Sequence, residues 1–321
     1  MNLRLVLIFG LLGVIALAWS ASFVVWRAAE LGALVGPLEE RHFSSLTVVA
    51  VGTGSGYENP ERLGPSTALA WGSEVVLVDA GRGVSEALRN AQIPVTQPRL
   101  ILLTNLLPLN VVGLDDLLYT GWLEDREEPL RVVGPPGTAA LVEGLLAAHQ
   151  AGADALGRVL PLSSRGARIE VEEVGDGYTE EIGNVTLRAG ALPGGALPAL
   201  AWRFERGRRS VVVSGTGWAP DALVEFARDT DLLVHEAVYV PPPEDIEGAG
   251  VIADPERLIQ EAALHTSIED VGALAKRAGA KQLALVRMRP PPFYNFQVAI
   301  IVGQTYDGEI SVPEDGESLS P

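Results

Sequence analysis

The stretch that decides the fold is Leu103-Thr104-Asn105-Leu106-Leu107-Pro108-Leu109-Asn110-Val111-Val112-Gly113-Leu114. It continues the apolar run 100–103, which has the length and composition of a short buried strand. Asp115 and Asp116 follow and indicate the start of a helix, because the helix dipole favours carboxylates in the first turn. We therefore expect a loop that leaves a buried strand and enters a helix.

Strands and helices alternate on both sides of this loop. The β-branched runs 46–51 and 75–78 are typical of a buried sheet, and 85–90 is expected to be a short helix. Their order, β-rich, then helical, then β-rich and helical again, favours an α/β fold with two sheets between helical layers. Further strands are expected at 130–133, 184–189, 200–205, 209–214, 231–234 and 283–286, and further helices at 138–149, 220–229, from 254 onward and at 267–279.

The glycine-rich stretch Val51-Gly52-Thr53-Gly54-Ser55-Gly56 invites a dinucleotide-binding interpretation, with Asp79 downstream. That interpretation needs a helix directly after the glycines, so that the helix N-terminus can hold a pyrophosphate. Pro60 and Pro65 prevent such a helix. The stretch therefore indicates a glycine turn after a strand, and the sequence has neither a serine-hydrolase elbow nor a phosphate-binding P-loop.

Several stretches together resemble the metallo-β-lactamase superfamily, in particular its ribonuclease Z and arylsulfatase-like hydrolases. They occur in the order and at the spacing of that family, over residues 46–306. The resemblance implies a four-layer αββα sandwich. The stretches are 51–54, 64–67, 78–83, the loop at 103–114, 134–138, 214–216, 235–237 and 265–267.

The chain departs from the family at the metal site that this resemblance implies. The family's metal loop reads T-H-x-H-x-D-H. The leucines found here cannot bind zinc, and the asparagines are poor ligands for it. The family's other ligands would stand near Pro193, at Thr216 or Gly217, and at Arg287. A two-zinc site uses about five histidines, whereas this chain has four, His42, His149, His235 and His265. We therefore expect no metal and no cofactor; the vacated positions are Asn105, Leu107, Leu109, Asn110, Thr216 and Arg287.

Arg287 is the one replacement that brings a charge. Its guanidinium could take the place of the missing cation and pair with Asp79 or another carboxylate. It could instead bind an anionic ligand, since arginine suits carboxylate and phosphate groups. In a third interpretation, the side chain of Arg287 turns to solvent at the end of its strand.

The candidate catalytic residues are His265, Glu236 and Asp79. The resemblance implies that His265 is a substrate contact or a proton donor, but without metal-activated water its proton has no leaving group to serve. A pocket wall or a partner of a helix cap is the other interpretation. For His235 and Glu236, at the end of a buried strand, we favour a structural role, and Asp79 is expected to brace the glycine-rich turn. His42 and His149 are expected to face solvent.

Composition excludes several classes of function. The formal net charge is −17, and such a surface repels polyphosphate, so nucleic acid is not an expected partner. The sequence has no cysteine, which excludes disulfides, thiolate metal sites and cysteine nucleophiles.

The N-terminal residues 5–26 are apolar apart from Ser20 and Ser22, and a helix of about 20 residues spans a bilayer. A signal peptide cleaved after Ala18 is the alternative. Because the apolar run continues to Trp26, we favour a single-pass inner-membrane anchor with a periplasmic domain. The expected division is an anchor or signal peptide at 1–27, an exposed tether at 28–43, the metallo-β-lactamase-like domain at 44–308 and a loose acidic tail at 309–321.

The resulting hypothesis is a membrane-anchored, metal-free pseudoenzyme that binds a small anionic ligand or a protein partner, with a homodimer also considered. The alternative is a hydrolase of esters, sulfates or phosphodiesters with an atypical or single-metal site, which would use His265, Asp79 and Glu236. A third hypothesis is an ancillary subunit of a membrane complex.

Overall fold

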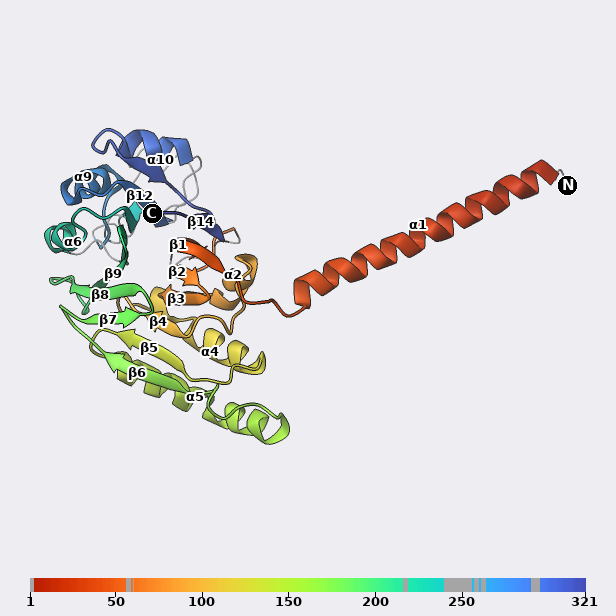
Figure 1. Cartoon of the computed structure of the whole chain (residues 1–321), viewed down its shortest axis with the longest axis horizontal. Coiled ribbons are helices and arrows are strands. Elements are labelled where there is room, and N and C mark those ends of the chain that lie inside the picture. Colours follow the sequence, from red (N-terminus) through yellow and green to blue (C-terminus); the bar gives the residue numbers. More distant parts are fainter. Residues whose placement is uncertain are drawn as a thin grey trace. The chain divides into compact units, whose positions relative to one another are not determined.

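The computed structural model of the chain describes residues 3–55, 59, 61–215, 219–239, 256, 260, 264–289 and 295–321 (Figure 1). The chain divides into two units, Met1–Glu39 and Glu40–Pro321. Each unit is described by itself.

The first unit contains one helix, α1 (Leu3–Val35). Its segment Phe9–Gly32 has a mean hydropathy of 2.0 and is long and apolar enough to cross a membrane, a property that signal sequences share. The exposed tether expected at 28–43 needs correcting, since the helix continues to Val35. Residues 28–35 are mostly alanine, leucine and glutamate, which favour helix, so nothing in the sequence ends α1 at Arg27.

The second unit contains two mixed sheets, each of seven strands in the described residues. The first has the order β14-β1-β2-β3-β4-β5-β6, antiparallel from β14 to β3 and parallel from β3 to β6. Its strands are β1 (Phe43–Gly52), β2 (Ser66–Gly72), β3 (Glu74–Val78), β4 (Leu100–Leu102), β5 (Leu130–Gly134), β6 (Ile169–Glu173) and β14 (Glu317–Leu319).

The second sheet has the order β13-β12-β11-β10-β9-β8-β7, antiparallel from β7 to β10 and parallel from β10 to β13. Its strands are β7 (Thr179–Ile182), β8 (Val185–Ala191), β9 (Leu200–Arg206), β10 (Arg209–Ser214), β11 (Leu232–Val238), β12 (Gln282–Arg289) and β13 (Glu309–Ser311).

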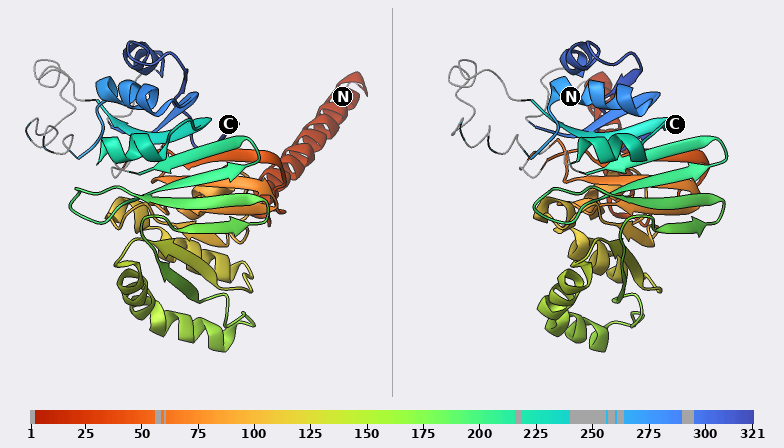
Figure 2. Two further views of the ribbon diagram at one scale, coloured as in Figure 1. Left: turned by 60° about the vertical axis from the view of Figure 1, so that its left-hand side comes forward. Right: turned by 90° about the vertical axis from the view of Figure 1, so that its left-hand side faces the viewer.

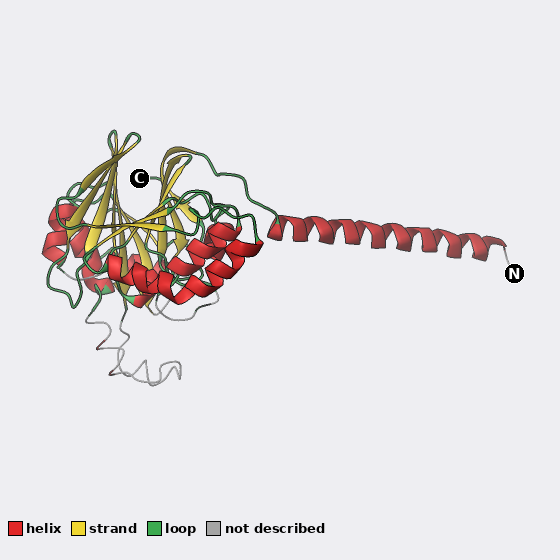
Figure 3. Ribbon diagram, turned by 90° about the horizontal axis from the view of Figure 1, so that it is seen from below, coloured by secondary structure: helices red, strands yellow, loops and turns green. Residues whose placement is uncertain are grey.

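Helices cover the outer face of each sheet, and the two sheets pack against each other (Figures 2 and 3). The inner layer between the sheets contains Trp71, Trp202 and Phe204. The αββα sandwich expected from the sequence is confirmed. The first sheet is accompanied by α2 (Val84–Asn90), α3 (Pro108–Val111), α4 (Leu114–Leu123) and α5 (Thr138–Val159), and the second by α6 (Pro220–Phe226), α9 (Ile268–Ala278) and α10 (Asn295–Val302).

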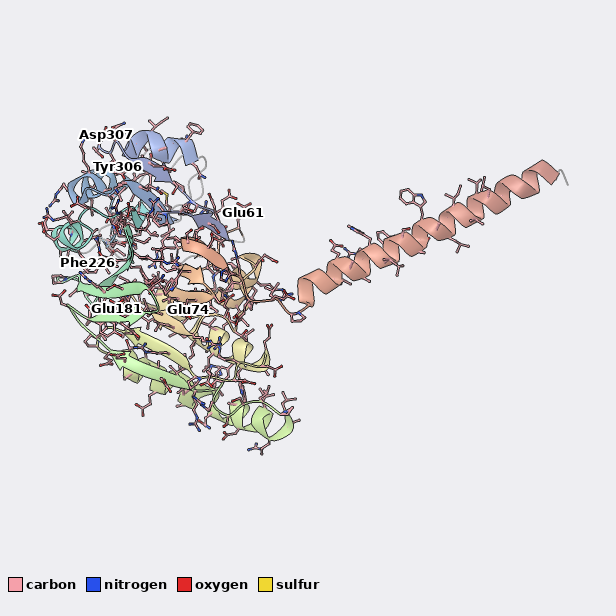
Figure 4. All side chains as sticks on the ribbon, in the orientation of Figure 1. Glu61, Glu74, Glu181, Phe226, Tyr306 and Asp307 are labelled. Atoms are coloured by element: carbon pink, nitrogen blue, oxygen red, sulfur yellow. The ribbon has the colours of Figure 1, made fainter. Side chains whose placement is uncertain are left out.

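The acidic segment 309–321 is not the loose tail that its composition suggests. β13 pairs with β12 and β14 pairs with β1, so this segment adds an edge strand to each sheet. Asp315 accepts hydrogen bonds from Thr53 N at 2.8 Å and Leu63 N at 2.6 Å. Just before β13, the hydroxyl of Tyr306 donates to Ala280 O at 2.9 Å (Figure 4 labels Tyr306). Backbone pairing and carboxylate acceptors outweigh the repulsion among the acidic side chains.

One helix prediction also differs from the structure, and another is not tested by it. The helix expected at 138–149 continues as α5 to Val159, since alanine and leucine after His149 sustain it despite Gly152 and Gly157. The helix expected from residue 254 falls largely outside the described residues. In contrast, the helix expected at 267–279 is confirmed: Ser267 Oγ accepts from Asp270 N, and Gly279 ends α9 in the left-handed conformation.

Candidate functional site

The glycine-rich stretches of the sequence meet backbone to backbone beside the first sheet. Gly113 N donates to Ala80 O at 2.9 Å, and Ala80 N donates to Asn110 O at 2.8 Å. A Cβ atom at Gly113 would lie 2.1 Å from Gly81 O, and one at Gly52 would lie 2.0 Å from Gly64 O. The glycines therefore allow the loops after β1, β3 and β4 to approach more closely than side chains would permit.

Asp79 lies at the end of β3 and is fully buried. Its Oδ1 accepts from Thr104 N at 2.8 Å and its Oδ2 accepts from Thr104 Oγ1 at 2.8 Å. Burial raises the pKa of the Asp79 carboxyl, while the charge of Arg287 and the donors from Thr104 oppose that rise. Asp79 does brace the turn after β3, but through Thr104 and Arg287 rather than through the glycines.

Arg287, in β12, is only 5% exposed, and its side chain points at Asp79. Nη2 forms a hydrogen-bonded ion pair with Asp79 Oδ2, and Nη1 donates to Asn110 Oδ1 at 2.9 Å and to Gly215 O at 3.2 Å. Of the three interpretations, exposure to solvent is wrong. Binding of an anionic ligand by Arg287 is not favoured, because both Nη atoms already donate to protein acceptors.

Backbone strain accompanies this ion pair at both of its residues. Asp79 has a φ of 63° and Arg287 a φ of 58°, values that disfavour any residue except glycine. Each costs on the order of 1 kcal/mol, and such conformations persist only where the surroundings impose them. Here the backbone N–H of Arg287 donates to Thr53 O at 2.8 Å and that of Asp79 to Leu102 O at 2.8 Å. These bonds fix both strand ends.

We refer to Asp79, Thr104, Asn105, Asn110 and Arg287 as the buried network. Asn110 Nδ2 donates to Asn105 Oδ1 at 2.8 Å and to Thr104 Oγ1 at 3.3 Å, which connects the loop after β4 to the ion pair. Sequence reasoning missed Thr104, although a hydroxyl residue directly after a buried strand was a usable signal. It also missed the role of Gly215, which contributes only its carbonyl oxygen.

The side chains at the former ligand positions do not fit the family's two-zinc centre. Leu107 and Leu109 offer no lone pair, Asn105 and Asn110 are neutral amides bonded to each other, and Arg287 adds a positive charge that repels a metal cation. Among the described residues no three histidine, aspartate or glutamate side chains form a group that could hold a metal ion. Thr216 lies outside the described residues.

A second cluster lies at the end of β11 and before α9. His265 Nδ1 is 2.5 Å from Glu236 Oε2, with the Glu236 side chain 3% and the His265 side chain 25% exposed. Glu236 Oε1 is buried and has no hydrogen-bond partner in the part of the chain that the structure describes. A partly exposed imidazole backed by a buried carboxylate can bind a ligand or transfer a proton.

His235 precedes Glu236 in β11, and its side chain points to the opposite face of the sheet. It is fully buried, and its Nε2 lies 2.9 Å from Thr266 Oγ1. Burial lowers the pKa of His235 to about 4, with the charges of Arg287 and His265 acting in the same direction and that of Glu236 against it. The charges of Glu236, His265 and Arg287 thus all act on His235, which stays neutral at pH 7.

The other two histidines lie elsewhere. His42 is exposed, and His149 is largely exposed on α5, with Nε2 3.1 Å from Asp115 Oδ2 and its ring on Tyr119. Asp116 accepts from Ser85 N at 3.2 Å and from Thr120 Oγ1 at 3.0 Å. Neither histidine belongs to the candidate site.

Two mixed sheets between helices, with glycine-rich loops gathered after β1, β3 and β4, define a protein of the metallo-β-lactamase fold. Solved structures agree: YhfI from Bacillus subtilis has a TM-score of 0.65 at 15% identity, covering 86% of this chain and 100% of YhfI. The short form of human tRNase Z has a TM-score of 0.62 at 20% identity, covering 86% and 99%.

The sequence comparison is more specific. A ribonuclease Z of Mycobacterium sp. (strain KMS) is 32% identical over 251 residues, which cover 77% of this chain and 85% of the relative. A ribonuclease Z of Mycobacterium bovis (strain BCG) is 30% identical over 279 residues, covering 84% and 96%. No protein-family model matches the chain. The chain belongs to the ribonuclease Z family.

The comparisons correct the prediction that the chain has no cofactor. Structures of this fold include a zinc-bound one, PqqB from Methylobacterium extorquens, with a TM-score of 0.60 at 15% identity, covering 86% of this chain and 100% of PqqB. The prediction took lost ligands at the family's usual positions as proof of a protein without any cofactor. The replaced ligands concern only one site on the fold, and the conclusion that the chain has no cofactor was wrong.

Proposed function

We propose that the domain is a ligand-binding member of the ribonuclease Z family. The observation that carries this proposal is the buried network. Asn110 and Arg287 stand at positions where the resemblance implies metal ligands, and Arg287 bonds to both Asn110 and Asp79. Because Arg287 and Asp79 are buried and their charges are paired with each other, neither is exposed to a substrate.

The proposed ligand contact is His265. Its ring is partly exposed, and Glu236 fixes its orientation through Nδ1 at 2.5 Å. An imidazole held in this way can donate a hydrogen bond to an anionic oxygen. The proposed ligand is therefore a small molecule with a phosphate, sulfate or carboxylate group, recognised by His265 and not by Arg287.

A hydrolase is the second candidate, and two observations favour it. The relatives are named ribonuclease Z and tRNase Z, and the His265–Glu236 pair has the composition of a general acid with a supporting carboxylate. A phosphodiester, sulfate ester or carboxylic ester would be its substrate.

One set of measurements separates the two candidates. We expect inorganic phosphate to bind the full-length protein in calorimetry, with affinity at least tenfold lower in His265→Ala and unchanged in the control His42→Ala. We also expect wild type and His265→Ala to hydrolyse bis(p-nitrophenyl) phosphate, p-nitrophenyl sulfate and p-nitrophenyl butyrate equally slowly, with or without added zinc or manganese. If wild type and His42→Ala turn over one of these substrates and His265→Ala does not, the binding proposal is wrong and the domain is a hydrolase.

We also propose that α1 is an uncleaved membrane anchor and that the domain is periplasmic. The proposal is supported by the length and hydropathy of Phe9–Gly32. The protein is expected to stay in the membrane pellet through a carbonate wash and to be digested by protease added to spheroplasts. A soluble periplasmic protein whose first residue is Trp19 would instead identify α1 as part of a signal peptide.

A further inference from the structure

A pocket of about 360 Å³ opens between α4 and α5, and no residue of the buried network or the His265 cluster lines it (Figure 1 shows the two helices). The α4 side is formed by Asp115, Asp116 and Tyr119, and the carboxylate of Asp116 is bonded to Ser85 N and Thr120 Oγ1. These residues lie at positions i, i+1 and i+4, which places Asp115 and Tyr119 one above the other on the helix. This side combines negative charge with an aromatic surface.

The α5 side of the pocket is mainly apolar. It is formed by His149, Gly152, Ala153 and Leu156, which recur at i, i+3, i+4 and i+7 on one helix face. Residues 152 and 153 are small, so their side chains do not fill the space between the two helices. A Cβ atom added at Gly152 would meet no atom within 4 Å. The pocket thus exists because residues 152 and 153, in the middle of this face of α5, are small.

Asp115 is placed to bind a further donor. One oxygen accepts from His149 Nε2 at 3.1 Å and the other from Asp116 N at 2.9 Å. An ionised carboxylate has about four acceptor positions, so both oxygens retain capacity. The His149 ring packs on Tyr119 with centroids 5.0 Å apart, which extends the aromatic surface to the carboxylate.

We propose that this pocket binds a small organic cation, an ammonium group attached to a flat apolar body. The ammonium would contact Asp115, and the apolar body would lie against Tyr119, Ala153 and Leu156. The volume is at the lower end of the range of ligand pockets, so the ligand is small. The carboxylate of Asp115 at the pocket disfavours an anionic ligand there.

The probes for this proposal are 2-phenylethylamine and 3-phenylpropionate. They share a phenyl ring and a two-carbon chain and differ in the charge at its end. Calorimetry on the full-length protein in detergent is expected to show saturable binding of the amine and none of the carboxylate under the same conditions. Failure of the amine to bind, or equal binding of both probes, would overturn the proposal.

Gly152→Leu tests the location of the site, because Gly152 lines the pocket and an added Cβ there meets no atom within 4 Å. Gly144→Leu is the matched control: it changes another exposed glycine of α5 whose added Cβ meets nothing within 4 Å and which lies outside the pocket. Both changes favour helix, so both variants should fold. We expect Gly152→Leu to weaken amine binding at least tenfold and Gly144→Leu to leave it within twofold.

Asp115→Asn tests the charge, and we expect at least a fivefold loss of affinity for 2-phenylethylamine. Wild-type affinity in Gly152→Leu would show that the amine binds elsewhere, and wild-type affinity in Asp115→Asn would show that the carboxylate does not recognise it. Either result contradicts the proposal.

Discussion

Arg287→Ala is expected to lower the free energy of unfolding of the domain by about 3–5 kcal/mol, the cost of removing one partner of a buried ion pair. The reason lies in the surroundings of Asp79, which is fully buried and would keep only the two donors of Thr104. A carboxylate in that position must either stay charged without a counter-charge or take up a proton. The measurement is urea unfolding of the full-length protein at pH 7, followed by tryptophan fluorescence.

Two variants make this result specific. Arg228→Ala removes an exposed arginine, 62% exposed as a side chain, that pairs with Glu225 at 2.6 Å. It should leave the free energy of unfolding nearly unchanged, because exposed ion pairs contribute little to stability. The double variant Asp79→Asn with Arg287→Met removes both buried charges, so it should be more stable than Arg287→Ala alone. A loss below about 0.5 kcal/mol in Arg287→Ala, the range of ordinary surface substitutions, would contradict the structural role of the pair.

Gly113→Ala is expected to destabilise the domain by about 3 kcal/mol, toward the upper end of the usual cost of overpacking. Its added Cβ would lie 2.1 Å from Gly81 O and 3.0 Å from Val84 Cγ1. Gly81 is itself held against Gly64 and Pro65, so its backbone cannot move away freely. The φ of Gly113 is −96°, which any residue can adopt, so the cost is steric rather than conformational.

The control for Gly113→Ala is Gly144→Ala, in the exposed middle of α5, where an added Cβ meets nothing within 4 Å. This change should stabilise the domain by about 0.5–1 kcal/mol, because alanine favours helix over glycine. Both values come from the same urea unfolding measurement. Equal and small effects of the two substitutions would mean that the loops after β3 and β4 do not pack as closely as the structure has them.

The fold could be predicted because its signals are local. Runs such as 46–51 and 75–78 are mostly apolar and rich in β-branched residues. Glycine and proline mark the turns between such runs, so strands and their order can be predicted from short windows. The two edge strands β13 and β14 could not be found in this way. They are three residues long and polar, and they form only because β12 and β1 offer unpaired backbone groups.

The candidate site was predictable in part for a different reason. Position within the family pattern places Asn105, Asn110 and Arg287 near Asp79, and a buried carboxylate needs a partner. The pattern could not show that Arg287 uses both Nη atoms on Asp79, Asn110 and Gly215, because that depends on the left-handed backbone at residues 79 and 287. The pocket between α4 and α5 escaped prediction because it is defined by small residues on a helix that was expected to end at His149.

The pairing of β14 with β1 has a consequence for the synthesis of the protein. β1 is the first strand of the domain to leave the ribosome and β14 the last, and β13 completes the other sheet only shortly before it. Domains of larger proteins often fold as they are synthesised, from the N-terminal side onward. Here each sheet lacks one edge strand until residues 309–319 have emerged, so the backbone pairing of β1 and β12 is complete only at the end of synthesis.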